Sequence, residues 1–140
     1  MPYRKTTIRP YRDEDEGLLF GLARESFGER NRWDDSRTIA TLESDTVFVA
    51  ELEGRAAGFV AVSHDDDAVR IDQLFVTVAH EGEGVGRQLL EYAEGFAISA
   101  GARRLEVMVE GDNRRALDFY RGRGFVPAGD ELLELVLPQA

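Results

Sequence analysis

Cysteine is absent from this 140-residue sequence, and so are long apolar runs. Without cysteine, the chain has neither a disulfide framework nor a thiolate metal site. No apolar run approaches the roughly 20 residues that span a membrane. The N-terminal MPYRKTTIRPYRDEDEG also lacks the apolar stretch of a signal peptide. We therefore expect a cytoplasmic protein that does not bind membranes.

Positive charge is also scarce. The chain has 17 lysines and arginines against 27 acidic residues, a formal charge of −10, and Lys5 is its only lysine. General nucleic-acid binders carry a basic patch, so we expect no nucleic-acid partner. The charge balance suits a cationic small substrate. It also fits a salt-adapted host, or simply a solvated acidic surface that keeps the protein soluble.

The apolar residues, 43% of the chain, suffice for the core of one domain spanning residues 1–140. Apolar periodicity predicts helices that begin at Asp13, cover 34–43, run from Val85 to Gly101, and run from Asp112 or Asn113 to about 122–124. Strand patterns cover 6–9, 46–52, 56–63, 68–78, 103–110, 125–127 and 131–137.

One pair of these strands is joined through a helix. Strand 68–78, its helix and strand 103–110 form a βαβ crossover, which makes the two strands parallel. Residues 53–55 (EGR) predict a hairpin, and 64–67 (HDDD) predict an exposed turn, since no calcium-ligand spacing follows. The expected fold class is α+β (mixed α/β), with a mixed, mostly antiparallel central sheet of six or seven strands and helices on both faces.

The stretch EGEGVGRQLL (81–90) places three glycines between a strand and a helix. Glycine permits positive φ and close backbone approach, and a helix start presents unpaired N–H groups, so the stretch predicts an anion site. The alternative is a plain turn. A Walker loop is excluded because Gly86 is followed by Arg87-Gln88, and the dinucleotide spacing G-x-G-x-x-G is absent.

Two stretches resemble signatures of the GNAT superfamily of acyl-CoA N-acyltransferases. LFVTVAHEGEGVGRQLL (74–90) is similar to motif A, roughly L-x-V-x-P-x-x-[R/Q]-x-x-G-x-G-x-x-L-L. DNRRALDFYRGRGF (112–125) is similar to N-x-x-A-x-x-F-Y-x-x-x-G-F, at the right distance. The resemblance, from about residue 6 to 127, implies a single GNAT N-acetyltransferase domain over 1–140. It also implies acetyl-CoA as cosubstrate.

The resemblance implies a set of cofactor-binding positions. The strand end would pair by its main chain with the pantetheine arm, in a splay between strands 68–78 and 103–110. The glycine loop would hold the pyrophosphate, and one asparagine and one tyrosine would lie along the arm and near the thioester sulfur. In chain order these positions are Leu74, Phe75, Val76, Glu81, Gly82, Glu83, Gly84, Val85, Gly86, Asn113 and Tyr120.

Two acids depart from the family pattern in this loop. Glu81 stands where the family has arginine or glutamine, and Glu83 where a basic residue is common. The cradle works mainly through main-chain N–H groups, so the glutamates can point to solvent. Arg87, and either Arg114 or Arg115, can supply positive charge. Because salt screens repulsion, we expect coenzyme A binding that strengthens with ionic strength.

The implied reaction is direct attack of an amine on the thioester, and an ammonium with a pKa near 10.4 must first lose a proton. Candidate bases are Asp72, Glu106, Glu110 and His80; the acid that some members carry near the end of the second strand falls on Met108. Strand alternation does not rank them, since a bulge reverses the facing. Tyr120 is the candidate general acid, its phenol pKa lying near 10. Its alternative role is packing.

The acceptor is either a small amine or a protein N-terminus. Trp33, within the segment 28–37, is a candidate to line the acceptor pocket. A homodimer is one option for the oligomeric state. A second function is a non-catalytic acyl-CoA sensor or interaction module on the same fold. A third, a nucleotide-phosphate enzyme, is disfavoured because the sequence has no Lys-Ser/Thr motif or metal-ligand cluster.

Overall fold

The computed structural model describes residues 6–27, 35–77, 82 and 84–139. Their order of elements agrees with the sequence prediction, with ends shifted by a few residues. In chain order they are β1 (Thr6–Pro10), a short 3₁₀ helix η1 (Asp13–Asp15), α1 (Glu16–Phe27), α2 (Asp35–Ser44), β2 (Thr46–Leu52), β3 (Arg55–Asp65), β4 (Ala68–Val76), α3 (Val85–Ser99), β5 (Arg104–Met108), α4 (Arg114–Gly122), β6 (Val126–Gly129) and β7 (Leu132–Val136).

All seven strands form one sheet, in the order β1-β2-β3-β4-β5-β7-β6. The neighbours β4 and β5 are parallel, and every other pair is antiparallel. The parallel pair is the one joined through α3, because a crossover long enough for a helix is needed to return a strand in the same direction. The predicted mixed, mostly antiparallel sheet is confirmed.

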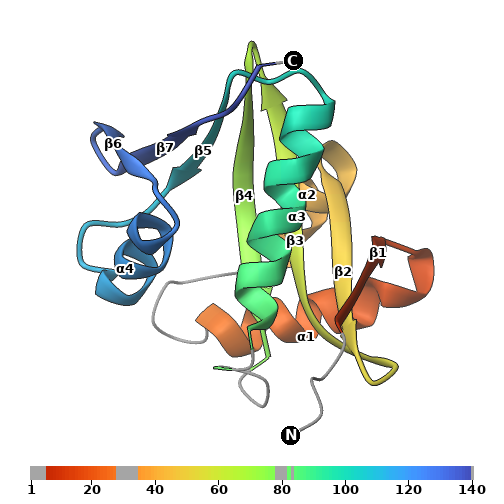
Figure 1. Cartoon of the computed structure of the whole chain (residues 1–140). Helices are drawn as coiled ribbons and strands as arrows, with labels where there is room; N and C mark the ends of the chain where they lie inside the picture. Colours follow the sequence, from red (N-terminus) through yellow and green to blue (C-terminus); the bar gives the residue numbers. More distant parts are fainter. Residues whose placement is uncertain (1–5, 28–34, 78–81, 83, 140) are drawn as a thin grey trace, which may run out of the picture.

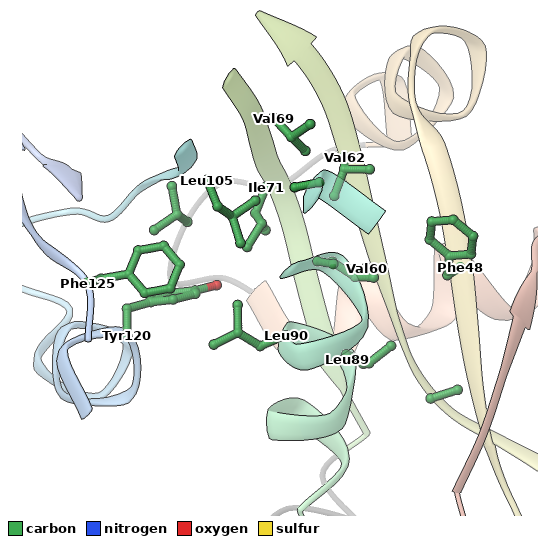
Figure 2. Close-up of a cluster of buried hydrophobic side chains, with 14 of the residues drawn as sticks. Phe48, Val60, Val62, Val69, Ile71, Leu89, Leu90, Leu105, Tyr120 and Phe125 are labelled. Carbon is green, nitrogen blue, oxygen red and sulfur yellow. The ribbon is translucent and has the colours of Figure 1, made fainter. Parts of the chain in front are cut away.

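Helices cover both faces of this sheet, as Figure 1 shows with α3 in front and α1 and α2 behind. The larger apolar cluster lies under α3 and α4 and includes Leu89, Leu90 and Tyr120 (Figure 2). The smaller lies on the other face, where Leu19 of α1 packs against Phe59 and Phe75. No described helix has both the length and the apolarity to cross a membrane. The sheet therefore has one apolar cluster on each of its faces.

The two hairpins before the crossover differ in how well the sequence predicts them. Between β2 and β3, Glu53 and Gly54 both have positive φ, 55° and 78°, as a two-residue turn of the primed kind requires. Between β3 and β4, the predicted turn at 64–67 is too long, because His64 and Asp65 pair with Val69 and Ala68 in the sheet. Cross-strand bonding extends the strands beyond the point where their sequence becomes polar.

Candidate active site

The parallel strands β4 and β5 pair over only part of their length. Residues Ala68–Ile71 pair with Arg104–Val107, whereas β4 continues to Val76. Beyond that point β5 pairs only with β7 on its other side, and Figure 1 shows the two strands close together at the top and separated lower down. Among the described residues, therefore, β4 and β5 do not pair beyond Ile71. An extended ligand can add to a sheet where two strands diverge in this way, as the predicted splay requires.

A β-bulge lies where this opening begins. Ala61 of β3 pairs with Gln73 and Val62 with Ile71, which leaves Asp72 without an opposite residue. Ile71 packs into the cluster under α3, whereas Phe75 packs into the cluster on the α1 and α2 face. The extra residue therefore shifts the alternation by one. Alternation from Ile71 puts Asp72 on the α1 and α2 face, whereas alternation back from Phe75 without the bulge would put it on the other face.

The glycine loop leads into α3 with an N-cap that has no side chain. Gly82 and Gly84 have φ of 81° and 85°, and Gly84, the N-cap residue, makes no side-chain capping bond. Its carbonyl accepts the first helical bond, from the Gln88 N–H at 3.1 Å. The first amides of α3 are thus without a side-chain cap, which suits an anion. Glu81, Glu83 and His80 lie outside the described residues, as does Trp33.

Gly86 and Val85 hold this loop against the core. Val85 is 1% exposed. A Cβ on Gly86 would meet Val76 Cγ2 at 3.5 Å and the Phe119 ring at 3.6 Å, so the third glycine lies between the end of β4 and α4. The helix start, the end of β4 and α4 therefore border one another.

Tyr120 projects from α4 into the larger cluster. It is 7% exposed, and its ring contacts Phe119 and Phe125 at centroid distances of 5.1 and 5.4 Å. Figure 2 shows its hydroxyl pointing away from α4, in the direction of Leu90. Burial raises the pKa of Tyr120 above the ordinary value near 10, higher than the sequence suggested. The phenol is therefore a proton donor at any working pH.

Asn113 caps α4. Its Oδ1 accepts a hydrogen bond from the Ala116 N–H at 3.2 Å, and its side chain is exposed. The capping role expected for asparagine at this position is thus present, and it leaves the side-chain N–H₂ available. Arg114 and Arg115 follow it on the exposed surface. The role of Asn113 toward a cofactor arm stays a prediction.

The candidate bases have different surroundings. Glu106 is 5% exposed and lies between Arg70 and Arg104, at 3.8 and 3.7 Å. Because it is buried and both of its cationic neighbours lie on the same sheet, its position favours a structural role. Glu110 is exposed beyond the end of β5, and Asp72 is exposed at the bulge. Asp72 is the candidate base that combines accessibility with a position beside the opening.

One residue missed by sequence reasoning lies beside Asp72. Asp45, between α2 and β2, has its carboxyl against that of Asp72, and burial together with this neighbour raises the pKa of Asp45 to about 7. In the sequence, Ser44-Asp45-Thr46 looks like an ordinary boundary between a helix and a strand. Its contact with Asp72 joins residues far apart in the chain, and no local pattern signals it.

Known proteins share this arrangement of elements. The sequence model of the Acetyltransferase (GNAT) family matches residues 10–125. Streptothricin acetyltransferase of Streptomyces lavendulae is 35% identical over 97 residues, which are 68% of this chain and 47% of that protein. Mycothiol acetyltransferase of Jonesia denitrificans is 43% identical over 75 residues, 52% of this chain and 24% of that protein. The chain thus spans half or less of the length of these two relatives.

Solved structures match over nearly the whole chain. The ribosomal-protein-S18-alanine N-acetyltransferase of Escherichia coli superposes with a TM-score of 0.82 at 20% identity, covering 97% of this chain and 96% of that one. PaiA N-acetyltransferase of Thermoplasma acidophilum, solved in complex with coenzyme A, has a TM-score of 0.76 at 17% identity and covers 94% and 99%. These likenesses show the fold. With the family match over residues 10–125, they establish that this chain belongs to the GNAT acetyltransferase family.

Proposed function

We propose that this protein transfers an acetyl group from acetyl-CoA to a primary amine, by direct attack in a ternary complex. The observation that carries the proposal is the divergence of β4 from β5 beyond Ile71, bordered by a helix start without a side-chain cap and by Tyr120. The amine nitrogen bonds to the thioester carbon and the carbon–sulfur bond breaks. Family membership supports acetyl-CoA as the donor.

The cosubstrate would lie along the opening. Its pantetheine arm would pair with the main chain of Leu74, Phe75 and Val76, as an added strand does. Its diphosphate would accept hydrogen bonds from main-chain N–H groups of the loop over 82–86, where the positive end of the α3 dipole adds to the attraction. N–H groups at the end of β4 would polarise the thioester carbonyl, in the manner of an oxyanion hole.

Tyr120 and Asp72 divide the proton transfers. The buried phenol would protonate the leaving thiolate, because it holds its proton and lies among the apolar residues between α3 and α4. Asp72, exposed at the bulge, would take the proton that the ammonium must lose. The presence of a donor and an acceptor beside one opening favours catalysis over a sensor that only binds acyl-CoA.

The acceptor and the compartment belong to the same proposal. The formal charge of −10 favours an amine that carries positive charge, in a small molecule or at a protein N-terminus. The absence of cysteine fits the cytoplasm, where we place the protein as a monomer or a homodimer.

An acceptor panel tests the proposed function directly. Acetyl-CoA is offered with a peptide that begins with alanine, with glucosamine and with streptothricin, and acetylated products are identified by mass spectrometry. We expect at least one amine to gain a single acetyl group with release of one equivalent of coenzyme A. Coenzyme A binding without any acetylated amine, across a widened panel, would favour the sensor instead.

Salt should strengthen coenzyme A binding. Glu81 and Glu83 repel the diphosphate, and at 1 M salt the screening length falls to about 3 Å. We expect a lower dissociation constant in 1 M KCl than in dilute buffer, measured by calorimetry. The double variant Glu81→Gln, Glu83→Gln is the control and should bind well in dilute buffer. A wild-type affinity that is flat or falls with salt contradicts this account.

Arg87 is exposed at the start of α3 and is held by an acid. Its Nε lies 3.6 Å from Glu91 Oε1, one turn along the helix, and the same oxygen lies 3.2 Å from Arg123. We predict that Glu91→Gln frees Arg87 and tightens coenzyme A binding about twofold, since exposed pairs of this spacing are weak. The same substitution in an Arg87→Gln background should have no effect on the dissociation constant. If Glu91→Gln still tightens binding in that background, the effect does not act through Arg87.

A further inference from the structure

Asp45 and Asp72 meet across the middle of the sheet. Asp45 directly precedes β2 and Asp72 is the bulged residue of β4, so β3 runs between them. Adjacent strands are about 4.8 Å apart, so β2 and β4 are separated by about twice that distance, which two aspartate side chains that reach toward each other can bridge over a small residue. Ala61 of β3 lies on this face and is fully buried. The Asp72 carboxyl reaches hydrogen-bonding contact with that of Asp45.

The contact is left without charge compensation when both carboxyl groups are ionised. Asp45 Oδ1 accepts a hydrogen bond from Ser44 Oγ at 3.0 Å, and that hydroxyl is bonded in turn to the Ala40 carbonyl at 2.8 Å. Asp45 Oδ2 is buried and has no hydrogen-bond partner in the ionised pair. One proton between the two groups converts the repulsive contact into a hydrogen bond.

The charged groups on the surrounding elements do not neutralise the pair. Among the described residues, α2 contributes the exposed Glu43, β4 contributes Arg70 and β5 contributes Glu106. Arg70 makes its ion pairs with Asp65 and Glu106. His64 of β3 is on the opposite face, against Phe96 at 6.0 Å. Among the side chains that the structure describes, which leave out those of 22–38 and 41, no cation is paired with either carboxylate.

We propose that Asp45 is a positioning residue for the base, and that Asp45 and Asp72 together hold the first proton that the acceptor ammonium gives up. This rests on the acetyl transfer proposed above. The doubly ionised pair takes one proton from R–NH₃⁺, which leaves R–NH₂ and a pair with one shared proton. The amine forms the C–N bond as the C–S bond breaks, and its second proton balances the thiolate through Tyr120.

The proton affinity of the pair suits this step. Burial, the hydrogen bond that protonated Asp45 donates to Asp72, and repulsion by the ionised Asp72 raise the pKa of Asp45 to about 7. A base is most effective when its pKa lies near the working pH, and a lone exposed aspartate near 3.9 is far weaker. Asp45 thus lets the pair take up a proton near neutral pH without itself touching the substrate.

A titration of the free protein tests the pair without any acceptor. With [γ-¹³C]aspartate labelling, we expect one carboxyl step near neutral pH in the wild type. In Asp45→Asn this step should be absent. The control Glu43→Gln removes an exposed acid two residues away and should leave the step in place. Wild-type spectra in which every aspartate titrates below about pH 5 overturn the inference.

Thermal unfolding supplies a second readout with a definite sign. A carboxyl whose pKa is raised by folding costs stability at pH values above that raised pKa, and costs none at pH values below its unfolded pKa. Relative to the wild type, Asp45→Asn should therefore unfold at higher temperature at pH 8.5 and at equal temperature near pH 4. A variant that is destabilised at both pH values would show that Asp45 is a structural residue and would overturn the inference.

The pH dependence of kcat/KM tests the role in catalysis, using the best amine of the acceptor panel. We expect an acid limb near pH 7 that Asp45→Asn moves down by at least about two units, with kcat at pH 8 lowered about tenfold. An active enzyme whose acid limb Asp45→Asn leaves in place overturns the inference, and acetyl transfer stands. If no amine is acetylated, the proposed function and the base role both fail, while the carboxyl titration still decides whether the proton is shared.

Discussion

Replacing Tyr120 with phenylalanine should lower kcat at least about 100-fold, while the dissociation constant of coenzyme A stays within about twofold. General acid catalysis contributes about 10²–10⁴-fold, and the substitution removes the hydroxyl alone. The ring contacts with Phe119 and Phe125 need no hydroxyl, so α4 should keep its packing against the core. Steady-state kinetics with the best acceptor, and calorimetry with coenzyme A, measure the two quantities.

Tyr92 offers a matched control. It lies on α3, 39% exposed, with its ring 4.7 Å from that of Phe48, and Tyr92→Phe should leave both quantities unchanged. The raised pKa of Tyr120 also predicts a pH profile. Because the phenol keeps its proton, its ionisation should cause no loss of activity as the pH rises to about 10. Turnover in Tyr120→Phe equal to the wild type would assign this residue to packing.

Gly58→Ala should destabilise the fold by about 3 kcal/mol, the upper range for overpacking. Gly58 of β3 pairs with Val76 at the end of β4. A Cβ there would lie 2.4 Å from the main-chain oxygen of Phe75 and 3.2 Å from Leu89 Cδ1. A backbone oxygen in a paired strand has no rotamer by which to move away, so β3 and β4 must separate.

The same substitution should weaken coenzyme A binding, since the displaced segment is the end of β4 that is proposed to pair with the pantetheine arm. Urea unfolding gives the stability and calorimetry the affinity. Gly95 of α3 is the control, because a Cβ there meets nothing within 4 Å. Gly95→Ala should stabilise by up to about 1 kcal/mol. If Gly58→Ala were as stable as the wild type, β3 and β4 would be able to separate around the new Cβ at little energetic cost.

The parts of the site that depend on local chain chemistry were predictable. Gly82 and Gly84 adopt positive φ, as a sequence G-x-G before a helix suggests, because glycine lacks the Cβ that disfavours this region. Asn113 caps α4 as its position before an apolar helix suggests. The parallel pairing of β4 and β5 follows from the helix between them. Each of these depends on neighbours within one turn or one crossover.

The elements, their order, the crossover and the glycine loop could be predicted from the residues, since periodicity and backbone stereochemistry act over a few positions. Which acid is available as a base depends on how the strands pack. The bulge at Asp72 depends on the register of β3 against β4. The burial of Glu106 between Arg70 and Arg104 depends on β4 and β5 lying side by side. Asp45 meets Asp72 across an intervening strand, because side-chain electrostatics depends on distance in space rather than along the chain.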